Sequence, residues 1–461
     1  MPFRPSRQSA VPDLIDDLRH VVGSDHVLSD PGLRASYETD WTRRWHGESL
    51  CVVRPASTSE VAGIVTACAA AAVPIVPQGG NTGLAGGSVP GGGLPVIVSL
   101  RRLTEMSDVN PTSGQVTVSA GCILEAVQQT AAGNGWEVGI DLASRASATI
   151  GGMIATNAGG TRVLRNGMMR RRVVGVEAVL ATGEVVRSMR GLGKDNTGYD
   201  LIGLMCGSEG TLGIVTGAIL QLVPARTHRM VALIGLESLE TAVETLTSLR
   251  PMLPSLDAVE YLSAECMDLV CSHAGLAPPL TRPHGAYLVL ECAGSIDPAP
   301  EMAAALAALD SVAVGDDSVT RERLWAYRES LTESISGRGI PRKLDLTLPL
   351  DRMAAFESAL KALVTERAAD AEVFMFGHLG DGGLHVNIVT AADPDDLSLD
   401  EAVLRLAAES GGSVSAEHGI GRAKVPFLGF GRSETEIATM RRIKRALDPA
   451  GILNPGVIFP R

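Results

Sequence analysis

Glycine is concentrated in three segments of the first half of the chain, and no other feature constrains the fold as strongly. The segments are GGNTGLAGGSVP (residues 79–90), ATIGGMIATNAGGTRVLRNG (148–167) and CGSEGTLGIVT (206–216). Because glycine lacks a Cβ atom, such segments let the main chain approach another group closely. Main-chain amides presented in this way can hold a phosphate. The first segment alone is equally consistent with a tight structural turn, but three segments together indicate a binding site.

The residues after the first segment argue against a Rossmann dinucleotide site. A short predicted strand over residues 74–77 leads into the glycines, as in many phosphate loops. A Rossmann fold also requires a helix directly after the loop. Here the sequence continues as SVPGGG (residues 88–93), which cannot form that helix.

Charge and apolar patterning exclude other classes of protein. The net charge of −12, from 40 basic and 52 acidic residues, argues against a general nucleic-acid binder but is compatible with a small anionic substrate. The first twenty residues show no apolar stretch of the signal-peptide type, and the longest apolar run, 61–76, is interrupted by Pro74. The seven cysteines form no CxxC pair and are expected to be reduced. We therefore expect a soluble, cytoplasmic protein.

The length of 461 residues predicts two or three domains, at about 100–200 residues each. After Pro224 predicted strands alternate with helices, a pattern typical of an α+β domain whose helices cover one face of a sheet. The expected parts are a helical lead-in, a glycine-rich domain, this second domain and a C-terminal segment, over residues 1–47, 48–225, 226–405 and 406–461.

A histidine-rich motif in the second half predicts a metal site. His378 and His385 stand in HLGDGGLH, and Glu417 follows about thirty residues later. Two neutral imidazoles and one carboxylate can bind a Zn²⁺-like ion and leave a position open for substrate. The spacing differs from HExxH, which disfavours a zinc protease of that type. A structural histidine pair is the alternative.

His418 is a candidate general base. It is adjacent to Glu417, and neighbouring residues of an extended segment point to opposite sides. An imidazole is suited to taking a hydroxyl proton near neutral pH. The alternatives are a third metal ligand or a residue that packs on a cofactor.

Three residues in LWAYRESLTESISGRGIPRK are candidates for carboxylate binding. Arg328 and Thr332 are four apart on a predicted helix and would share a face, while Lys343 lies on the following strand. Arginine suits bidentate carboxylate binding, and threonine adds a neutral hydrogen bond. Ordinary surface charge is the alternative.

Four motifs occur in the order PQGGNTGL, IGGMIATNAGG, KDNTGYDL and GSEGTLGI. In this order they resemble the FAD-dependent vanillyl-alcohol oxidase and p-cresol methylhydroxylase family, in the branch of the D-lactate and D-2-hydroxyglutarate dehydrogenases. The resemblance extends from about Pro55 to Asn454. It implies an α+β fold with a two-lobed FAD-binding domain, an α/β cap domain that covers the substrate, and a C-terminal segment that returns to the flavin.

The resemblance also implies which residues contact FAD, mostly within the glycine-dense segments. They are Pro77, Gly79, Gly80, Asn81, Thr82, Gly83, Ser147, Ile150, Gly151, Gly152, Thr156, Asn157, Gly160, Glu209, Gly210, Ile214 and Asn454. Some members of this fold attach the flavin through a histidine or cysteine. Residues 79–93 and 147–167 contain neither, so we expect non-covalent FAD.

For the second half, the resemblance supports a divalent metal, with zinc expected, on His378, His385 and Glu417. Gly383 is a departure, because close relatives often have asparagine in this position of the motif. The implied substrate contacts are Arg328, Thr332, Lys343, Asn387 and Asn81.

The residues and the resemblance together predict FAD- and metal-dependent oxidation of a D-2-hydroxy acid to the 2-oxo acid. The best substrate is a dicarboxylate such as D-2-hydroxyglutarate, with hydride transfer to flavin N5 and His418 as the base. The electron acceptor would be an electron-transfer flavoprotein, a quinone or a similar partner, and a homodimer is one assembly to consider. The alternatives are a D-lactate- or glycolate-type dehydrogenase, a flavin oxidase that uses oxygen, and a zinc hydrolase.

Overall fold

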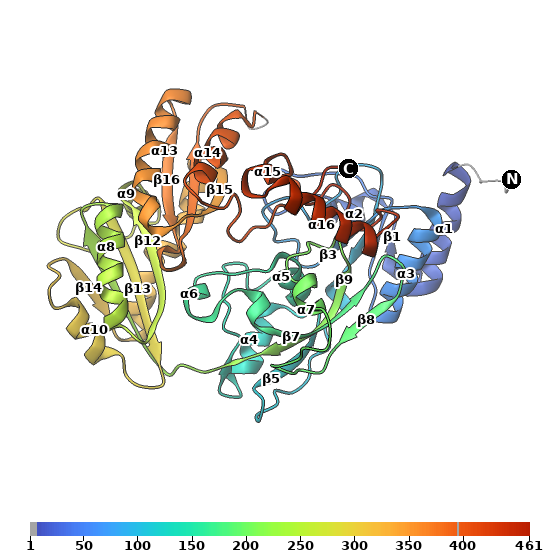
Figure 1. The fold of residues 1–461 in the computed structure, drawn as a ribbon, viewed down its shortest axis with the longest axis horizontal. Helices are drawn as coiled ribbons and strands as arrows, with labels where there is room; N and C mark the ends of the chain where they lie inside the picture. Colours follow the sequence, from blue (N-terminus) through green and yellow to red (C-terminus); the bar gives the residue numbers. More distant parts are fainter. Residues whose placement is uncertain (1–6, 394–395) are drawn as a thin grey trace. The chain divides into compact units, whose positions relative to one another are not determined.

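The computed structural model describes residues 7–393 and 396–461; residues 1–6 of the expected lead-in and 394–395 of the expected second domain lie outside the described residues. The chain forms two compact units (Figure 1). The first contains the residues up to 159 together with 167–224 and 417–461, and the second contains 160–166 and 225–416. No helix within the described ranges is long and apolar enough to cross a lipid bilayer.

The first unit contains a small sheet from which the first glycine-dense segment emerges. Its order is β1 (Val27–Leu28), β2 (Cys51–Val53), β4 (Val96–Ser99), β3 (Ile75–Gln78). Strand β4 is parallel to both of its neighbours. Helices α1 (Arg7–Val22) and α3 (Thr58–Ala71) contribute Leu18 and Ile64 to the buried core over this sheet. The Ser57 hydroxyl accepts from the Glu60 amide (3.2 Å) and so caps the start of α3.

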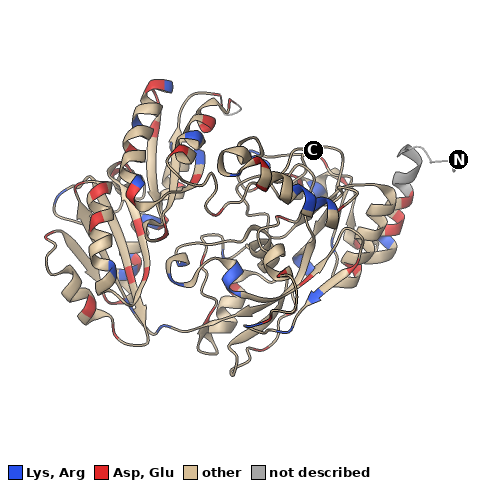
Figure 2. Cartoon of the chain, viewed as in Figure 1, with Lys and Arg blue, Asp and Glu red and all other residues tan. Residues whose placement is uncertain are grey.

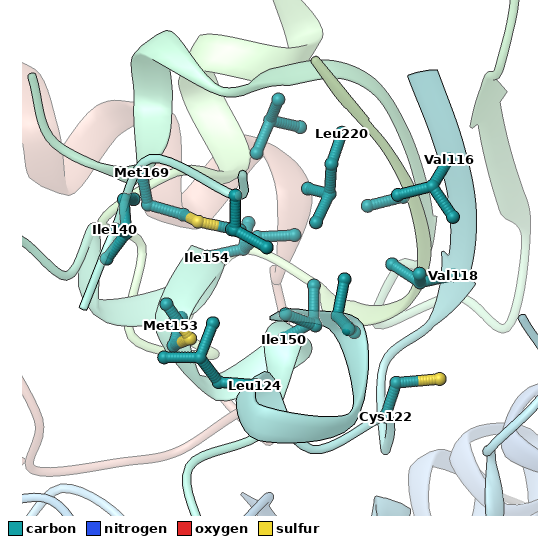
Figure 3. Close-up of a cluster of buried hydrophobic side chains, with 14 of the residues drawn as sticks. Val116, Val118, Cys122, Leu124, Ile140, Ile150, Met153, Ile154, Met169 and Leu220 are labelled. Carbon is teal, nitrogen blue, oxygen red and sulfur yellow. The ribbon is translucent and has the colours of Figure 1, made fainter. Parts of the chain in front are cut away.

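A second sheet of the first unit is antiparallel and has a separate core. Its order is β5 (Gln115–Ser119), β9 (Ile214–Gln221), β7 (Val173–Val179), β8 (Val185–Ser188). Helices α4 (Leu124–Ala132) and α5 (Ile150–Thr156) pack on it. Figure 3 shows this cluster, in which Leu124 lies beside Met153, and which also includes Val118 of β5 and Leu220 of β9.

The remaining elements of the first unit are short, apart from the last helix. They are α2 (Pro31–Glu38), β6 (Trp136–Glu137), α7 (Leu201–Met205), β10 (Val223–Pro224), α15 (Leu428–Gly431) and α16 (Glu434–Leu447). Helix α16 begins with a capping box between Ser433 and Glu436. It carries acidic residues in its first turn and basic residues in its last (Figure 2), which complements the helix dipole.

The second unit is built on one seven-stranded sheet in which every neighbouring pair is antiparallel. The strand order is β14 (Val312–Gly315), β11 (His228–Leu236), β13 (Ala286–Gly294), β12 (Leu256–Ser263), β16 (Glu372–Gly377), β17 (Gly383–Val389), β15 (Arg342–Thr347). Its helices are α6 (Val163–Asn166), α8 (Leu239–Leu249), α9 (Ala264–His273), α10 (Ala299–Leu306), α11 (Ser318–Glu329), α12 (Leu331–Ser336), α13 (Met353–Arg367) and α14 (Ser398–Glu409).

Helices cover both faces of this sheet, so the expectation of helices on one face only is wrong. Leu262 and Phe376 form a register pair and lie in a core cluster with residues of α9, α11 and α12. The neighbouring Tyr261 points to the opposite face, where its hydroxyl is 3.4 Å from Glu357 of α13. The physical reason is that every residue of β12 is buried, so both faces require cover.

Candidate active site

The register of the second unit's sheet places several of the predicted site residues on one face. Lys343 of β15 pairs with Asn387 of β17, and Asp345 pairs with His385. His385 also pairs with Phe376 of β16. Register partners in an antiparallel sheet share a face, and so do residues two apart in a strand. The cationic, amide and imidazole groups therefore lie on the face that carries α9, α11 and α12.

A tight turn brings the two histidines of the motif together. His378 follows β16, and a 3₁₀ turn over Leu379–Asp381 leads back into β17. Gly382 adopts a left-handed conformation with φ 86°, which glycine allows without strain. The His378 and His385 ring centroids are 5.2 Å apart, and the planes are 82° to each other. This pairing fits two imidazole ligands of one ion.

Gly383, where close relatives often have asparagine, lies close to other residues of the turn. The Asp381 carboxylate accepts from the Gly383 amide (3.1 Å), so Asp381 acts in the turn. A Cβ atom at Gly383 would meet Asp381 Oδ1 at 3.1 Å and His378 Cβ at 3.4 Å. An asparagine here would therefore require a small shift of the neighbouring side chains.

Glu260 is a site residue that the motifs did not reveal. Its carboxylate is fully buried on β12, where Oε1 is 2.6 Å from His378 Nδ1 and Oε2 accepts from Arg328 Nε at 2.6 Å. Burial by itself raises the pKa of Glu260, but the charges of His378 and Arg328 and their hydrogen bonds outweigh it and bring the pKa to about 2. The one signal in the sequence was an acidic residue within an otherwise apolar predicted strand.

Arg328 is held by two contacts, neither of which uses its terminal nitrogens. Its guanidinium lies over the Phe376 ring, 4.5 Å from the centroid, and its Nε is bound to Glu260. Among the described residues, none accepts a hydrogen bond from its two Nη groups. Arg328 therefore retains donors for a further carboxylate.

The expected continuous helix through Arg328 and Thr332 is wrong. Helix α11 ends at Glu329, Ser330 lies between the helices, and α12 begins at Leu331. Thr332 is exposed on α12 and Arg328 lies in the last turn of α11, so a shared contact with a carboxylate stays a prediction.

Lys343 is half-buried, and no carboxylate in the described part of the chain pairs with its ammonium group. Burial accordingly lowers the pKa of Lys343. The adjacent Arg342 points to the other face, where it is paired with Asp400 of α14. A half-buried cation without a counter-charge is costly, and an anionic ligand would offset that cost.

In the first unit, two glycine-dense segments pack against each other. A Cβ atom at Gly79 would meet Thr149 Oγ1 at 2.3 Å, and one at Gly80 would meet the Ser147 carbonyl oxygen at 2.1 Å. Across the described ranges, no residue accepts a hydrogen bond from the main-chain amides of residues 79–83. A run of such amides fits a phosphate, so this loop fits the pyrophosphate of FAD.

Three predicted FAD contacts use their side chains within the protein. Asn81 donates to the Thr39 carbonyl (2.8 Å) and accepts from the Ser88 hydroxyl (2.8 Å). The Asn157 carbonyl oxygen accepts from the Arg170 amide (2.9 Å). Asn454 donates to the Gly87 and Glu209 carbonyls. These side chains hold loops together, and their contact with FAD or, for Asn81, substrate stays a prediction.

Glu209 fastens the C-terminal segment to the third glycine-dense segment. Its two carboxylate oxygens accept from the Ile420 amide (2.8 Å) and the Gly421 amide (2.7 Å). Burial raises the pKa of Glu209 to about 7, although these two amides and Lys424 act to lower it. Glu209, which the resemblance assigns to FAD, is thus one of the residues that join 417–461 to the rest of the first unit.

The other predicted FAD contacts lie in or beside the same segments. The Ile150 and Ile214 side chains are buried in the core, and the Ile150 amide donates to the Cys122 carbonyl (2.9 Å), so their contacts with FAD stay a prediction. Thr156 donates its hydroxyl to the Gly152 carbonyl (3.1 Å). Gly210 packs against Pro77, where a Cβ atom would be 2.7 Å from Pro77 Cγ.

Glu417 and His418 are half-buried at the point where the chain re-enters the first unit. The residue before them, Ala416, donates its amide to the Asp345 carbonyl (3.3 Å) in the second unit. Glu417 therefore directly follows a residue that is hydrogen-bonded to β15, the strand in which Asp345 pairs with His385.

The chain matches two protein families along most of its length. The FAD binding domain matches residues 49–188, and the C-terminal domain of FAD linked oxidases matches residues 225–458. These matches remove the zinc-hydrolase alternative. Solved structures with a similar fold include 4-ethylphenol oxidase from Gulosibacter chungangensis, with a TM-score of 0.75, 20% identity and 98% of each chain covered. Substrate-bound p-cresol methylhydroxylase has a TM-score of 0.77, 17% identity and 98% of each chain covered. The expected fold is confirmed.

Curated relatives are similar over nearly the whole chain. The mitochondrial D-2-hydroxyglutarate dehydrogenase of Bos taurus is 39% identical over 446 residues, which cover 94% of this chain and 81% of that protein. The D-2-hydroxyglutarate dehydrogenase of Xanthomonas citri pv. viticola is 38% identical over 458 residues, which cover 96% of each. The resemblance predicted from the motifs is therefore confirmed, and the chain belongs to the FAD-linked oxidases, in the family of the D-2-hydroxyglutarate dehydrogenases.

Proposed function

We propose that this protein oxidises D-2-hydroxyglutarate to the corresponding 2-oxo acid, with FAD as the hydride acceptor and a divalent metal in the active site. The observation that carries the choice of a dicarboxylate is Lys343, a half-buried ammonium group without a described carboxylate partner. It stands in register with Asn387 on the face that also carries His385. The names of the relatives supply the particular dicarboxylate.

The distal carboxylate of the substrate would bind to Lys343 and to the Nη groups of Arg328. A planar guanidinium and a compact ammonium group together satisfy the acceptors of one carboxylate. Thr332 is exposed on α12, and its contact with the substrate stays a prediction.

His378, His385 and Glu417 would hold the metal, with zinc expected. His378 Nδ1 is 2.6 Å from Glu260 Oε1, so His378 would bind an ion through Nε2. When bound, the ion would act as a Lewis acid on the substrate hydroxyl, and FAD would accept the hydride from C2. His418 would take the hydroxyl proton.

Anaerobic bleaching of the bound flavin tests the proposed substrate. Mixing the protein with D-2-hydroxyglutarate should bleach the absorbance near the flavin maximum, whereas L-2-hydroxyglutarate should not. Faster bleaching by D-lactate or glycolate would contradict the dicarboxylate assignment. Rapid reoxidation of the reduced flavin in air would identify an oxidase instead.

Replacement of Lys343 by methionine should raise the KM for D-2-hydroxyglutarate by about 10–100-fold, because a charge-assisted contact contributes about 1.5–3 kcal/mol. The kcat/KM for D-lactate, which lacks the distal carboxylate, should stay unchanged. Lys361→Met is the matched control, since Lys361 is an α13 lysine paired with Glu357 (3.0 Å). An equal loss with both substrates would place Lys343 on the common carboxylate.

FAD should be bound without a covalent link. Residues 79–93 and 147–167 contain no histidine or cysteine. Cys206, in the third glycine-dense segment, is buried, and burial raises the pKa of its thiol to about 11, which disfavours the reactive thiolate. After acid precipitation the yellow colour should stay in the supernatant; colour in the washed pellet would show a covalent flavin.

The electron acceptor, an electron-transfer flavoprotein, a quinone or a similar partner, and a homodimeric assembly remain part of this proposal. So does the cytoplasmic location, for which the relatives differ: the bovine name specifies mitochondria, and the Xanthomonas name specifies no compartment.

A further inference from the structure

We propose that Glu260 is a positioning residue shared by the metal subsite and the distal-carboxylate subsite, so that both depend on one buried side chain. The inference rests on the proposed function and deepens it. It assigns to a residue outside every sequence motif the role of orienting a metal ligand and a substrate-binding arginine at once.

The geometry of Glu260 leaves no oxygen for another role. Oε1 is 2.6 Å from His378 Nδ1, and Oε2 accepts from Arg328 Nε at 2.6 Å. The carboxylate is fully buried, and it stands on β12, an interior strand between β13 and β16. A side chain with no exposed surface cannot move to serve one partner without losing the other.

The contact of the Glu260 carboxylate with His378 determines which ring nitrogen of His378 could bind a metal. An Nδ1–H that donates to Glu260 leaves the lone pair on Nε2, the atom that would face an ion. His378 is only 6% exposed, so water is a poor substitute for this contact.

The contact of the same carboxylate with Arg328 orients the guanidinium group of that arginine. Glu260 holds Nε, and the Phe376 ring supports the planar face at 4.5 Å. Phe376 is also next to His385, with ring centroids 5.2 Å apart. The two Nη groups, which no described residue engages, are thereby held ready for an incoming carboxylate.

A purely structural ion pair in the same unit has a different pattern. Arg342 is paired with Asp400, and its terminal nitrogens also donate to the carbonyls of Asp393 and Asp396. Both terminal nitrogens of that guanidinium are thus used by the protein. Arg328 by contrast uses only Nε, which favours a role in binding over a role in stability alone.

Glu260→Met tests the proposal because methionine has a similar length and no strong hydrogen-bond acceptor. The variant and the wild type are prepared with FAD and without metal, and Zn²⁺ is titrated by calorimetry. We expect the Zn²⁺ dissociation constant to rise by about 10–100-fold, as for other residues that orient a metal-bound histidine. At saturating Zn²⁺, the kcat/KM ratio of D-2-hydroxyglutarate to D-lactate should fall by about 10-fold.

Glu260→Gln is the second variant, for use if the methionine variant does not fold. A glutamine offers one oxygen, so it can accept from one of the two donors and presents an NH₂ group to the other. At least one of the two measurements should therefore change. Glu357→Gln is the control, because Glu357 contacts Tyr261 on the opposite face of the sheet; both of its values should match the wild type.

The outcomes separate this inference from the proposed function. Wild-type values in both measurements for folded Glu260→Met or Glu260→Gln would overturn the role of Glu260 and leave the proposed function intact. A change in only one measurement for Glu260→Met would contradict a shared role. A wild-type protein that neither binds Zn²⁺ nor prefers D-2-hydroxyglutarate would overturn the proposed function and this inference with it.

Discussion

The rate of flavin reduction should fall by about 10²–10⁴-fold when His418 is replaced by alanine, the usual contribution of a positioned general base. The variant should retain FAD and near-normal metal content, because His378, His385 and Glu417 remain. Its residual rate should rise with pH, since hydroxide can partly replace the imidazole. Anaerobic stopped-flow measurements of flavin absorbance give the rate, and elemental analysis gives the metal content.

The control for this experiment is a histidine on the surface of the first unit. His20→Ala removes an exposed imidazole of α1 whose Nδ1 contacts the Asp16 carbonyl, and it should reduce flavin at the wild-type rate. Loss of metal from His418→Ala would make His418 a ligand, and the base would then have to be another residue.

Removal of the metal is expected to abolish turnover while FAD stays bound. The two histidines belong to the second unit, whereas the amides of residues 79–83 that fit the pyrophosphate belong to the first. Chelation should therefore strip the ion without loosening the flavin. After prolonged dialysis against a chelator and gel filtration, flavin absorbance should remain with the protein, and Zn²⁺ should restore activity.

The control for chelation is dialysis without chelator, which should leave both metal and activity. Undiminished turnover in protein shown by elemental analysis to be metal-free would exclude a catalytic role for the ion. Release of FAD together with the metal would show that the two sites are not independent.

The sequence alone was sufficient to predict those features that depend on residues close together in the chain. Gly80 is required because its main chain lies so close to the Ser147 carbonyl that a Cβ atom would be 2.1 Å from the oxygen. The short spacing of His378 and His385 is closed by one turn, so their pairing was predictable from the motif. The fold class followed from the family resemblance that the glycine-rich motifs carry.

The role of Glu260 could not be predicted in this way. Glu260 and His378 are 118 residues apart, and Glu260 and Arg328 are 68 apart. Only the pairing of β12 with β16 and the packing of α11 on that face bring the three together. The same holds for Glu209, which reaches Ile420 across 211 residues.

The sequence by itself therefore determined the family resemblance, and with it the α+β fold. It also determined the pairing of the two histidines, because they are close together in the chain. The tertiary structure decided that helices cover both faces of the large sheet, that α11 ends before Thr332, and that Lys343 has no described counter-charge. These features depend on which side chains meet across strands and helices distant in sequence. Hydrophobic periodicity does not predict such contacts. It shows which face of a helix or strand is buried, but not which other element packs against that face.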